Sequence, residues 1–135
     1  MDEAKFITLD NCLTILIYTD RSKSTNHMEL FTFYGGNYSS YIDYNGKKRN
    51  IKEGSAHLLE HYVCENTVSG DLLDNLRKYN VLSCNAGTSA FNTSYFFNTV
   101  CNFYECLDTF LDGIYNVSFT NEKLNKTKYA VLNEI

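Results

Sequence analysis

The chain has 135 residues, and its 16 acidic and 12 basic side chains give a formal net charge of −4. This length fits one domain, or one half of a larger one. A hydrophobic content of 44% is enough for a packed core and excludes a disordered chain, because disordered segments are poor in apolar and aromatic residues. The acidic balance excludes a basic surface for nucleic acid. The one basic cluster, residues 47–49, is typical of a solvated loop.

The cysteines and the hydropathy of the chain indicate its compartment. Five cysteines, an odd number without a CxxC pair, predict reduced thiols rather than a disulfide framework. No window approaches the roughly 18 apolar residues of a membrane helix. Residues 1–10 have the pattern of neither a secretory signal nor a transit peptide. We therefore expect a cytoplasmic protein whose partners include neither nucleic acid nor a membrane.

The first 52 residues predict strands followed by a loop. Runs of β-branched and apolar residues at 6–9 and 13–18 flank a polar turn, which favours a hairpin. Residues 28–34 alternate apolar with polar side chains and predict a third strand that ends at a Gly-Gly pair. Residues 37–52 show no periodicity, and we expect a loop there.

From about Glu53 to Glu65 the apolar residues recur with helical spacing. A second helix is predicted over 69–79, with Ser69 as its cap, a leucine stripe on one face, and Asn80 ending it in a left-handed conformation. The remaining elements predicted are strands over 81–88 and 93–100, a helix over 103–115, and a helix from 120 or 121 to the end of the chain.

This order of elements predicts the fold class. Strands, two helices, strands and two helices indicate an α+β layer, with helices packed on one face of a mixed, mainly antiparallel β-sheet. The chain shows no internal repeat and no linker. We expect one compact unit over residues 1–135.

One short motif carries most of the chemistry in this sequence. Two of the three histidines lie in His57-Leu58-Leu59-Glu60-His61, an HxxEH pattern. Residues i, i+3 and i+4 share one face of a helix. Two imidazoles one turn apart can bind one zinc ion, and a carboxylate beside them can take a proton from water whose pKa the metal has lowered.

A solvated helix face is the alternative reading of this motif. A random shuffle of this composition would contain HxxEH in about 0.4% of chains, so chance is a weak explanation. The small residues of Gly54-Ser55-Ala56 before the motif would also let another backbone approach. The pattern therefore favours a metal site over a structural role.

Three ordered segments resemble the pitrilysin/insulinase family of zinc metallopeptidases, whose HxxEH order is the inverzincin signature. Residues 54–61 (GSAHLLEH) are similar to the family's G-x-A-H-F-L-E-H. Residues 85–97 (NAGTS, then TSYFF) resemble its N-A-x-T-S and T-x-Y-x-F stretch. Residues 130–135 (AVLNEI) resemble the end of the helix that carries the third ligand, and Glu134 stands 73 residues after His61, a separation typical of the family.

The resemblance implies roles that the spacing alone does not assign. It implies that His57, His61 and Glu134 are zinc ligands and that Glu60 is the general base. It also implies that strands 81–100 form a sheet edge along which an extended peptide substrate pairs, with Asn85, Ala86 and Gly87 close to that peptide. The alternative for Asn85 is a turn residue that satisfies its own backbone.

Two positions depart from the family pattern. The family usually carries a second glutamate seven residues before the third ligand, where this chain has Thr127. A carboxylate that orients a ligand is worth roughly 10–100-fold in metal affinity or activity, so its loss would weaken the site. Cys64 replaces a large apolar residue and follows His57 by seven positions, so it is either a thiolate ligand or, as we expect, a core residue.

By this resemblance the protein is a zinc-dependent metalloendopeptidase that hydrolyses peptides or small unfolded polypeptides. The resemblance implies that residues 1–135 are the N-terminal portion of a peptidase domain, truncated after the third-ligand helix. A second, homologous half, on the same chain or on a separate subunit, would enclose the substrate, so we expect this piece to be inactive alone. The alternatives are a non-catalytic subunit that helps enclose substrate and an inactive zinc-binding fragment.

Overall fold

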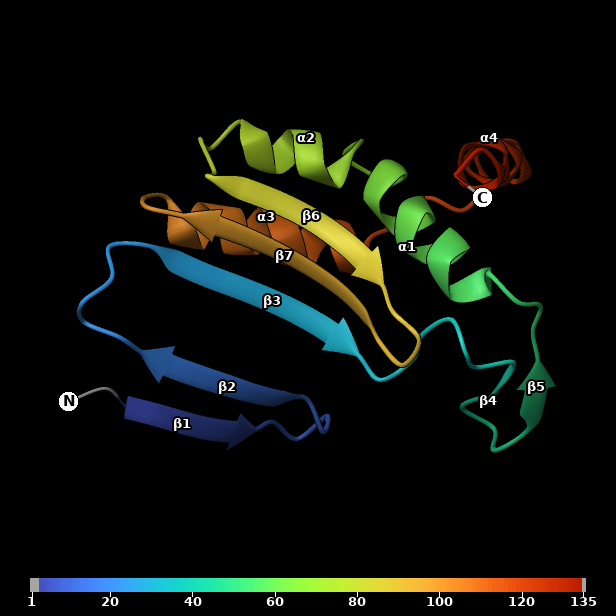
Figure 1. The fold of residues 1–135 in the computed structure, drawn as a ribbon, viewed down its shortest axis with the longest axis horizontal. Helices are drawn as coiled ribbons and strands as arrows, with labels where there is room; N and C mark the ends of the chain where they lie inside the picture. Colours follow the sequence, from blue (N-terminus) through green and yellow to red (C-terminus); the bar gives the residue numbers. More distant parts are fainter. Residues whose placement is uncertain (1–2, 135) are drawn as a thin grey trace.

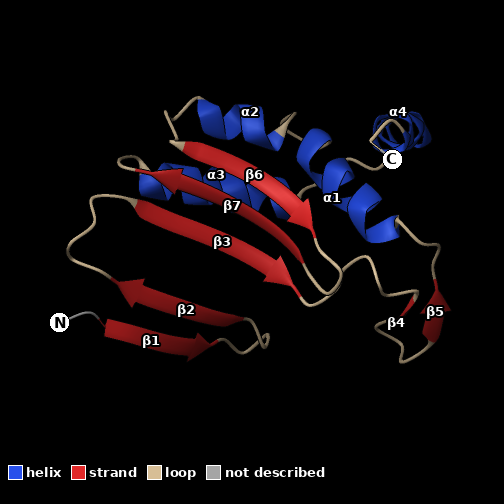
Figure 2. Cartoon of the chain, in the orientation of Figure 1, coloured by secondary structure: helices blue, strands red, loops and turns tan. Residues whose placement is uncertain are grey.

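The computed structural model describes residues 3–134, which form seven strands and four helices (Figures 1 and 2). Within the described residues every strand pairing is antiparallel, and the chain has the α+β character predicted from the order of its elements. The elements in chain order are β1 Glu3–Thr8, β2 Thr14–Thr19, β3 Asn26–Thr32, β4 Ser40–Ile42, β5 Lys48–Asn50, α1 Ser55–Glu65, α2 Leu72–Arg77, β6 Ser83–Thr88, β7 Thr93–Thr99, α3 Phe103–Tyr115 and α4 Asn121–Leu132.

The central sheet has three strands in the order β3-β7-β6. Side chains of the middle strand, β7, alternate strictly between a buried and a half-buried face, as expected for a sheet covered on one side. The predicted N-terminal hairpin forms as the separate pair β1-β2, with Thr8 opposite Thr14. This pair and strand β3 belong to different hydrogen-bonded sheets.

Helices α1, α2 and α3 cover the face of the central sheet on which Tyr95 and Phe97 are buried. The ring of Phe97 meets that of Phe110 on α3 with centroids 5.5 Å apart. The remaining members of this buried core come from the same three helices and are Val63, Cys64, Leu72, Leu76 and Cys106. The core therefore joins α1 to β7, and Cys84 and Ala86 of β6 pack against it.

Helix α4 has a different neighbour. It packs against α1 at the edge of the molecule, so it lies over a helix and not over the sheet (Figure 1). Only Thr127 and Val131 of α4 are buried, which gives this helix a narrow contact stripe. The docking of α4 on α1 therefore depends on few side chains.

Three local features differ from the predictions. The segment predicted as a loop over 37–52 contains the short hairpin β4-β5, because Asp43 accepts hydrogen bonds from the backbone of residues 45 and 47 and from the side chain of Arg49. Helix α2 is capped by Asp71 rather than Ser69, since the Asp71 carboxylate accepts from the Asp74 N–H at 2.9 Å. Helix α4 ends at Leu132 and does not continue to the end of the chain; Ile135 lies outside the described residues.

Two predictions for the second helix hold in part. Asn80 has the predicted left-handed conformation, with a φ of 57°, but α2 is shorter than the predicted helix over 69–79 and ends at Arg77, with Lys78 as its C-cap. The apolar stripe of that helix is buried at Leu72 and Leu76.

Among residues 3–134, no helix combines the length and the apolar character that crossing a membrane requires.

Candidate metal centre

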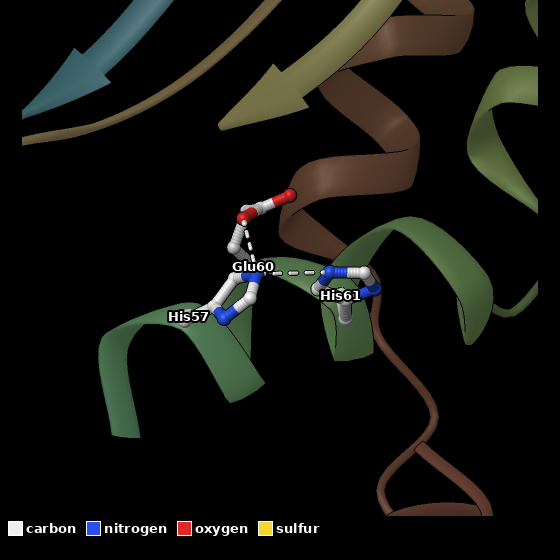
Figure 3. Close-up of side chains that lie close together, drawn as sticks. All are labelled: His57, Glu60 and His61. Carbon is white, nitrogen blue, oxygen red and sulfur yellow. Dashed lines mark hydrogen bonds and ion pairs between the residues drawn. The ribbon is translucent and has the colours of Figure 1, made fainter. Parts of the chain in front are cut away.

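Helix α1 presents the HxxEH motif on one face (Figure 3). The chain enters the helix through Gly54, whose φ of 77° is a left-handed conformation that glycine adopts at little cost. Toward its end, α1 contributes Val63 and Cys64 to the core. This burial fixes the rotation of the helix about its axis, and both histidines remain half-buried.

The ligand atoms expected for a metal lie close together. Nε2 of His57 is 3.1 Å from Nε2 of His61. Oε2 of Glu134 lies 3.4 Å from Nε2 of His57 and 3.3 Å from Nε2 of His61. Two imidazoles of one helix and a carboxylate 73 residues after His61 therefore lie around one point.

This donor set fits zinc. Zinc–nitrogen and zinc–oxygen distances of about 2.0–2.1 Å place tetrahedral ligand atoms about 3.3–3.4 Å apart. The three observed separations, 3.1, 3.3 and 3.4 Å, are close to that value. Three protein ligands on one side of an ion leave a fourth position open, as in catalytic zinc sites.

A second carboxylate, that of Glu60, lies beside the histidines. Oε2 of Glu60 is 3.9 Å from Nε2 of His57, which is farther than the Glu134 oxygen. One ligand atom from each of His57, Glu60 and His61 lies within 4.8 Å of the other two, so these three residues could hold a metal without Glu134. The oxygen of Glu134 is nearly equidistant from both nitrogens, whereas Glu60 is 6% exposed and has a partner of its own.

That partner is Thr88, at the end of β6. The Thr88 hydroxyl donates a hydrogen bond of 3.2 Å to Oε2 of Glu60. The Thr93 hydroxyl, 3.3 Å from that of Thr88, donates to the backbone oxygen of Tyr34. Helix α1 is thereby connected to two strands of the central sheet.

The start of α4 is held by Tyr62 of α1. The Tyr62 hydroxyl donates to the Ser118 carbonyl at 3.0 Å and accepts from the Thr120 N–H at 2.9 Å. Its ring stacks on Phe119 with centroids 4.9 Å apart. Glu134, two residues beyond the last residue of α4, donates its N–H to the Val131 carbonyl at 3.1 Å. These contacts hold both ends of the segment that brings Glu134 to the histidines.

Sequence reasoning did not single out Glu65. Its Oε1 atom lies 3.8 Å from Nδ1 of His61, and its Oε2 atom accepts a hydrogen bond of 2.9 Å from the Thr127 hydroxyl. The signal was present in the sequence, because Glu65 follows His61 by four positions and such residues share a helix face. The Thr127 contact had no local signal, since the two residues are 62 positions apart.

Cys64 belongs to the core, as expected, and not to the cluster of ligands. It is 6% exposed and packs with Val63, Leu72 and Tyr95. Burial, with a smaller contribution from the Glu60 carboxylate, raises the pKa of the Cys64 thiol to about 12. Burial also raises the pKa of Tyr95. Cys64 is therefore a buried core thiol, and it is not part of the His57, Glu60 and His61 group found among the described residues.

The predicted substrate-binding residues all lie on β6. Within the described residues β6 pairs with β7 and with no other strand, so it forms one edge of the central sheet. Asn85 pairs in register with Phe96 inside the strand and is not a turn residue. Asn85 and Gly87 are exposed, whereas Ala86 is half-buried and packs against the core. The structure thus separates the three residues between two faces of one strand.

Comparison with known proteins agrees with this geometry. The family model described as insulinase (peptidase family M16) matches residues 47–135, which is more than half of the chain. A curated relative, named as the uncharacterized zinc protease YmfH of Bacillus subtilis (strain 168), is 27% identical over 129 residues; the match covers 94% of this chain and 29% of that protein.

Solved structures share the fold. A protein described as an M16-like peptidase from Alicyclobacillus acidocaldarius has a TM-score of 0.88 at 24% identity, with 99% of this chain and 31% of that chain covered. A protease from Helicobacter pylori has a TM-score of 0.80 at 19% identity, over 99% and 31% of the two chains. Pitrilysin has a TM-score of 0.76 at 20% identity, over 98% and 14%.

The chain spans less than a third of the length of each of these relatives. The family match itself covers the HxxEH motif, the β6-β7 hairpin and helix α4. The chain therefore belongs to the insulinase (M16) family of peptidases.

Proposed function

We propose that this chain carries the catalytic zinc site of a metalloendopeptidase that hydrolyses peptides or small unfolded polypeptides. One observation carries the proposal: Oε2 of Glu134 lies 3.3–3.4 Å from Nε2 of both histidines, while Glu60 stays beside them with its carboxylate held by Thr88. When bound, zinc would polarise the substrate carbonyl and lower the pKa of water at the open position. The name of the B. subtilis relative, a zinc protease, supports the choice of metal.

Glu60 is the general base in this proposal. Its carboxylate takes a proton from the attacking water as the carbon–oxygen bond forms. It then delivers the proton to the amide nitrogen as the carbon–nitrogen bond breaks, which releases an amine and a carboxylic acid. Burial at 6% exposure keeps the carboxylate away from bulk water, and the hydrogen bond from Thr88 restricts its rotation.

The free edge of β6 would bind the substrate. An extended peptide can add to such an edge through main-chain hydrogen bonds. The exposed face of β6 carries Asn85 and Gly87, and, apart from Gly87 and its two chain neighbours, no described residue has an atom within 4 Å of a Cβ built on Gly87. Thr88, the last residue of β6, contacts Glu60, so a peptide on this edge would lead to the metal centre.

Turnover would require more than this chain. The chain spans 31% of two structural relatives, and we propose that a second, homologous half, on the same polypeptide or on a separate subunit, encloses the substrate. We call that complete form the assembled peptidase. The isolated chain would bind zinc and show negligible hydrolysis. By itself the chain would then match the last of the alternatives expected from the sequence, an inactive zinc-binding fragment.

A cytoplasmic location is also proposed. All five cysteines in the described part of the chain are free, and Cys64 and Cys106 are buried. Free thiols are typical of a reducing compartment. Fractionation of cells that express the protein would test this location.

Metal analysis of the purified chain tests the site directly. We expect one zinc per chain in the parent and in the control Glu105→Ala, since Glu105 is an exposed glutamate on α3. His61→Ala and Glu134→Ala should both lose the metal. Zinc lost only from His61→Ala would mean that Glu134 is not a ligand. A parent without zinc after reconstitution near pH 7.5 would exclude the proposed metal centre.

Catalysis is tested in the assembled peptidase. Glu60→Gln should retain one zinc and lose hydrolysis of an unfolded polypeptide, because the amide cannot accept the proton. Full hydrolysis by the zinc-loaded variant would exclude Glu60 as the base.

Gly87→Leu should fold and retain zinc but raise KM, since the new side chain would fill the space beside the β6 edge.

A further inference from the structure

The two ring nitrogens of His61 face different groups. Nε2 faces the ligand cluster, 3.1 Å from His57 and 3.3 Å from Glu134. Nδ1 faces Oε1 of Glu65 at 3.8 Å, which is within ion-pair range and longer than a hydrogen bond. Glu65 therefore lies on the side of the ring that points away from the proposed metal, so it is not itself a ligand.

Glu65 is held in this place from a second helix. Its other oxygen, Oε2, accepts a hydrogen bond of 2.9 Å from the Thr127 hydroxyl. Thr127 is fully buried, and its oxygen accepts from Nδ2 of Asn66 at 3.3 Å. The same Asn66 nitrogen donates to the Tyr62 carbonyl at 3.1 Å. Oε1 of Glu65 therefore faces His61, and Oε2 is held by Thr127.

The donor and the acceptor of each hydrogen bond in this series can be identified. Asn66 Nδ2 can only donate, so the Thr127 oxygen accepts from it. The single proton of the Thr127 hydroxyl then goes to Glu65. That leaves Oε1 of Glu65 as an acceptor toward Nδ1 of His61. Through its negative charge, a carboxylate oxygen 3.8 Å away favours the tautomer with the ring proton on Nδ1, which leaves the lone pair of Nε2 for a metal.

We infer that Glu65 is a positioning residue for His61, and that Thr127 orients Glu65. The inference rests on the proposed zinc site. It also explains the departure at position 127, where a glutamate is usual in the family: in this chain the orienting carboxylate comes from α1, and α4 contributes a hydroxyl that aims it.

Substitution of Glu65 by glutamine separates positioning from packing. Glu65→Gln keeps the shape of the side chain and an oxygen that accepts from Thr127, so helix docking is retained. Because the glutamine oxygen then faces Thr127, its NH₂ group faces Nδ1 of His61, a donor in place of an acceptor. The ring would favour the tautomer with its proton on Nε2. We expect zinc affinity to fall roughly 10–100-fold.

The measurement is competition for zinc with a chromophoric chelator, on the intact chain. Glu105→Gln, the same change at an exposed site on α3, should bind as the parent does. The visible absorption spectrum of the cobalt(II)-loaded chain should shift in Glu65→Gln only, because the spectrum reports ligand geometry. The urea midpoint of the metal-free chain should stay that of the parent.

Thr127→Val supplies a second test. In the Glu65→Gln background it removes the proton that holds the glutamine oxygen, so the amide can turn that oxygen toward His61. The double variant should therefore bind zinc more tightly than Glu65→Gln alone. Binding that is equal or weaker would overturn the role of Thr127. Unchanged affinity and an unchanged cobalt spectrum in Glu65→Gln would overturn the role of Glu65, whereas a parent that binds no zinc would overturn the proposed site itself.

Discussion

The hydroxyl of Thr88, the last residue of an edge strand, donates a hydrogen bond of 3.2 Å to the carboxylate of Glu60 on helix α1. The nearby Thr93 hydroxyl gives its proton to the Tyr34 carbonyl, so the proton of Thr88 is available to Glu60. The strand proposed to bind substrate and the carboxylate proposed as the base are thereby joined through one side chain.

Thr88→Val should impair catalysis without loss of metal. The valine has the same shape and lacks the donor, so Glu60 would be free to leave its catalytic orientation. We expect kcat of the assembled peptidase to fall roughly tenfold or more, with zinc stoichiometry unchanged. Thr88→Ser, which keeps the hydroxyl, should retain most of the activity. If the valine variant turned over as fast as the serine variant, the hydrogen bond would have no catalytic role.

Tyr62→Phe should loosen helix α4. The variant loses one bond to the Ser118 carbonyl and one from the Thr120 N–H, and both backbone groups lie next to the start of the helix. Leaving such groups without a partner costs about 1–3 kcal/mol. Urea unfolding should show this loss, and zinc affinity should fall because Glu134 follows the same helix. Tyr104→Phe, at a residue that is 76% exposed, is the matched control and should change neither quantity.

Gly35→Ala should destabilise the fold, and its neighbour provides the control. A Cβ at residue 35 would lie 2.6 Å from the Asn92 nitrogen and 2.7 Å from the Phe91 nitrogen, both of them backbone atoms of the β6-β7 turn. A Cβ at Gly36 would meet its nearest atom at an ordinary 3.6 Å. We expect Gly35→Ala to lower the free energy of unfolding by about 1–3 kcal/mol. Equal urea midpoints for the two alanine variants would contradict the close approach.

Stability should fall at alkaline pH, partly through Cys64. The unfolded chain loses the thiol proton near the ordinary value of 9.0, whereas the folded chain keeps it up to about pH 12. The unfolded state therefore binds fewer protons between these values, and the free energy of unfolding declines as pH rises. One such group contributes at most about 1.4 kcal/mol per pH unit.

Urea unfolding at pH 8 and pH 10, with a chelator present, measures this decline. Cys64→Ala should show a smaller decline than the parent, although its stability at pH 8 is lower. Part of the decline should remain, because burial also raises the pKa of Cys84 and of Tyr95. Cys12→Ala, at an exposed thiol, should keep the parent's pH dependence. Identical declines in Cys64→Ala and Cys12→Ala would rule out the contribution of Cys64.

Local pattern alone was enough for much of this molecule. The 3.6-residue period placed His57, Glu60 and His61 on one helix face, and α1 shows them there. The alternation of side chains predicted β3, two further runs predicted β6 and β7, and a polar turn between two apolar runs predicted the first hairpin. These features depend on residues a few positions apart, which is the range over which backbone geometry and side-chain spacing act.

Contacts over long separations in sequence were decided by the tertiary structure. Helix α4 packs on α1 through Thr127 and Val131, and this packing brings Glu134 to the histidines and Thr127 to Glu65. The position of Glu134 had been expected from family resemblance and not from spacing. The hairpin β4-β5 and the cap at Asp71 were missed because carboxylate hydrogen bonds to nearby backbone N–H groups can override a weak or absent periodicity. The sequence by itself determined which residues could share a face, whereas only the packing of helices against one another determined which faces meet, because a helix pattern specifies the direction of a side chain and not its distant neighbour.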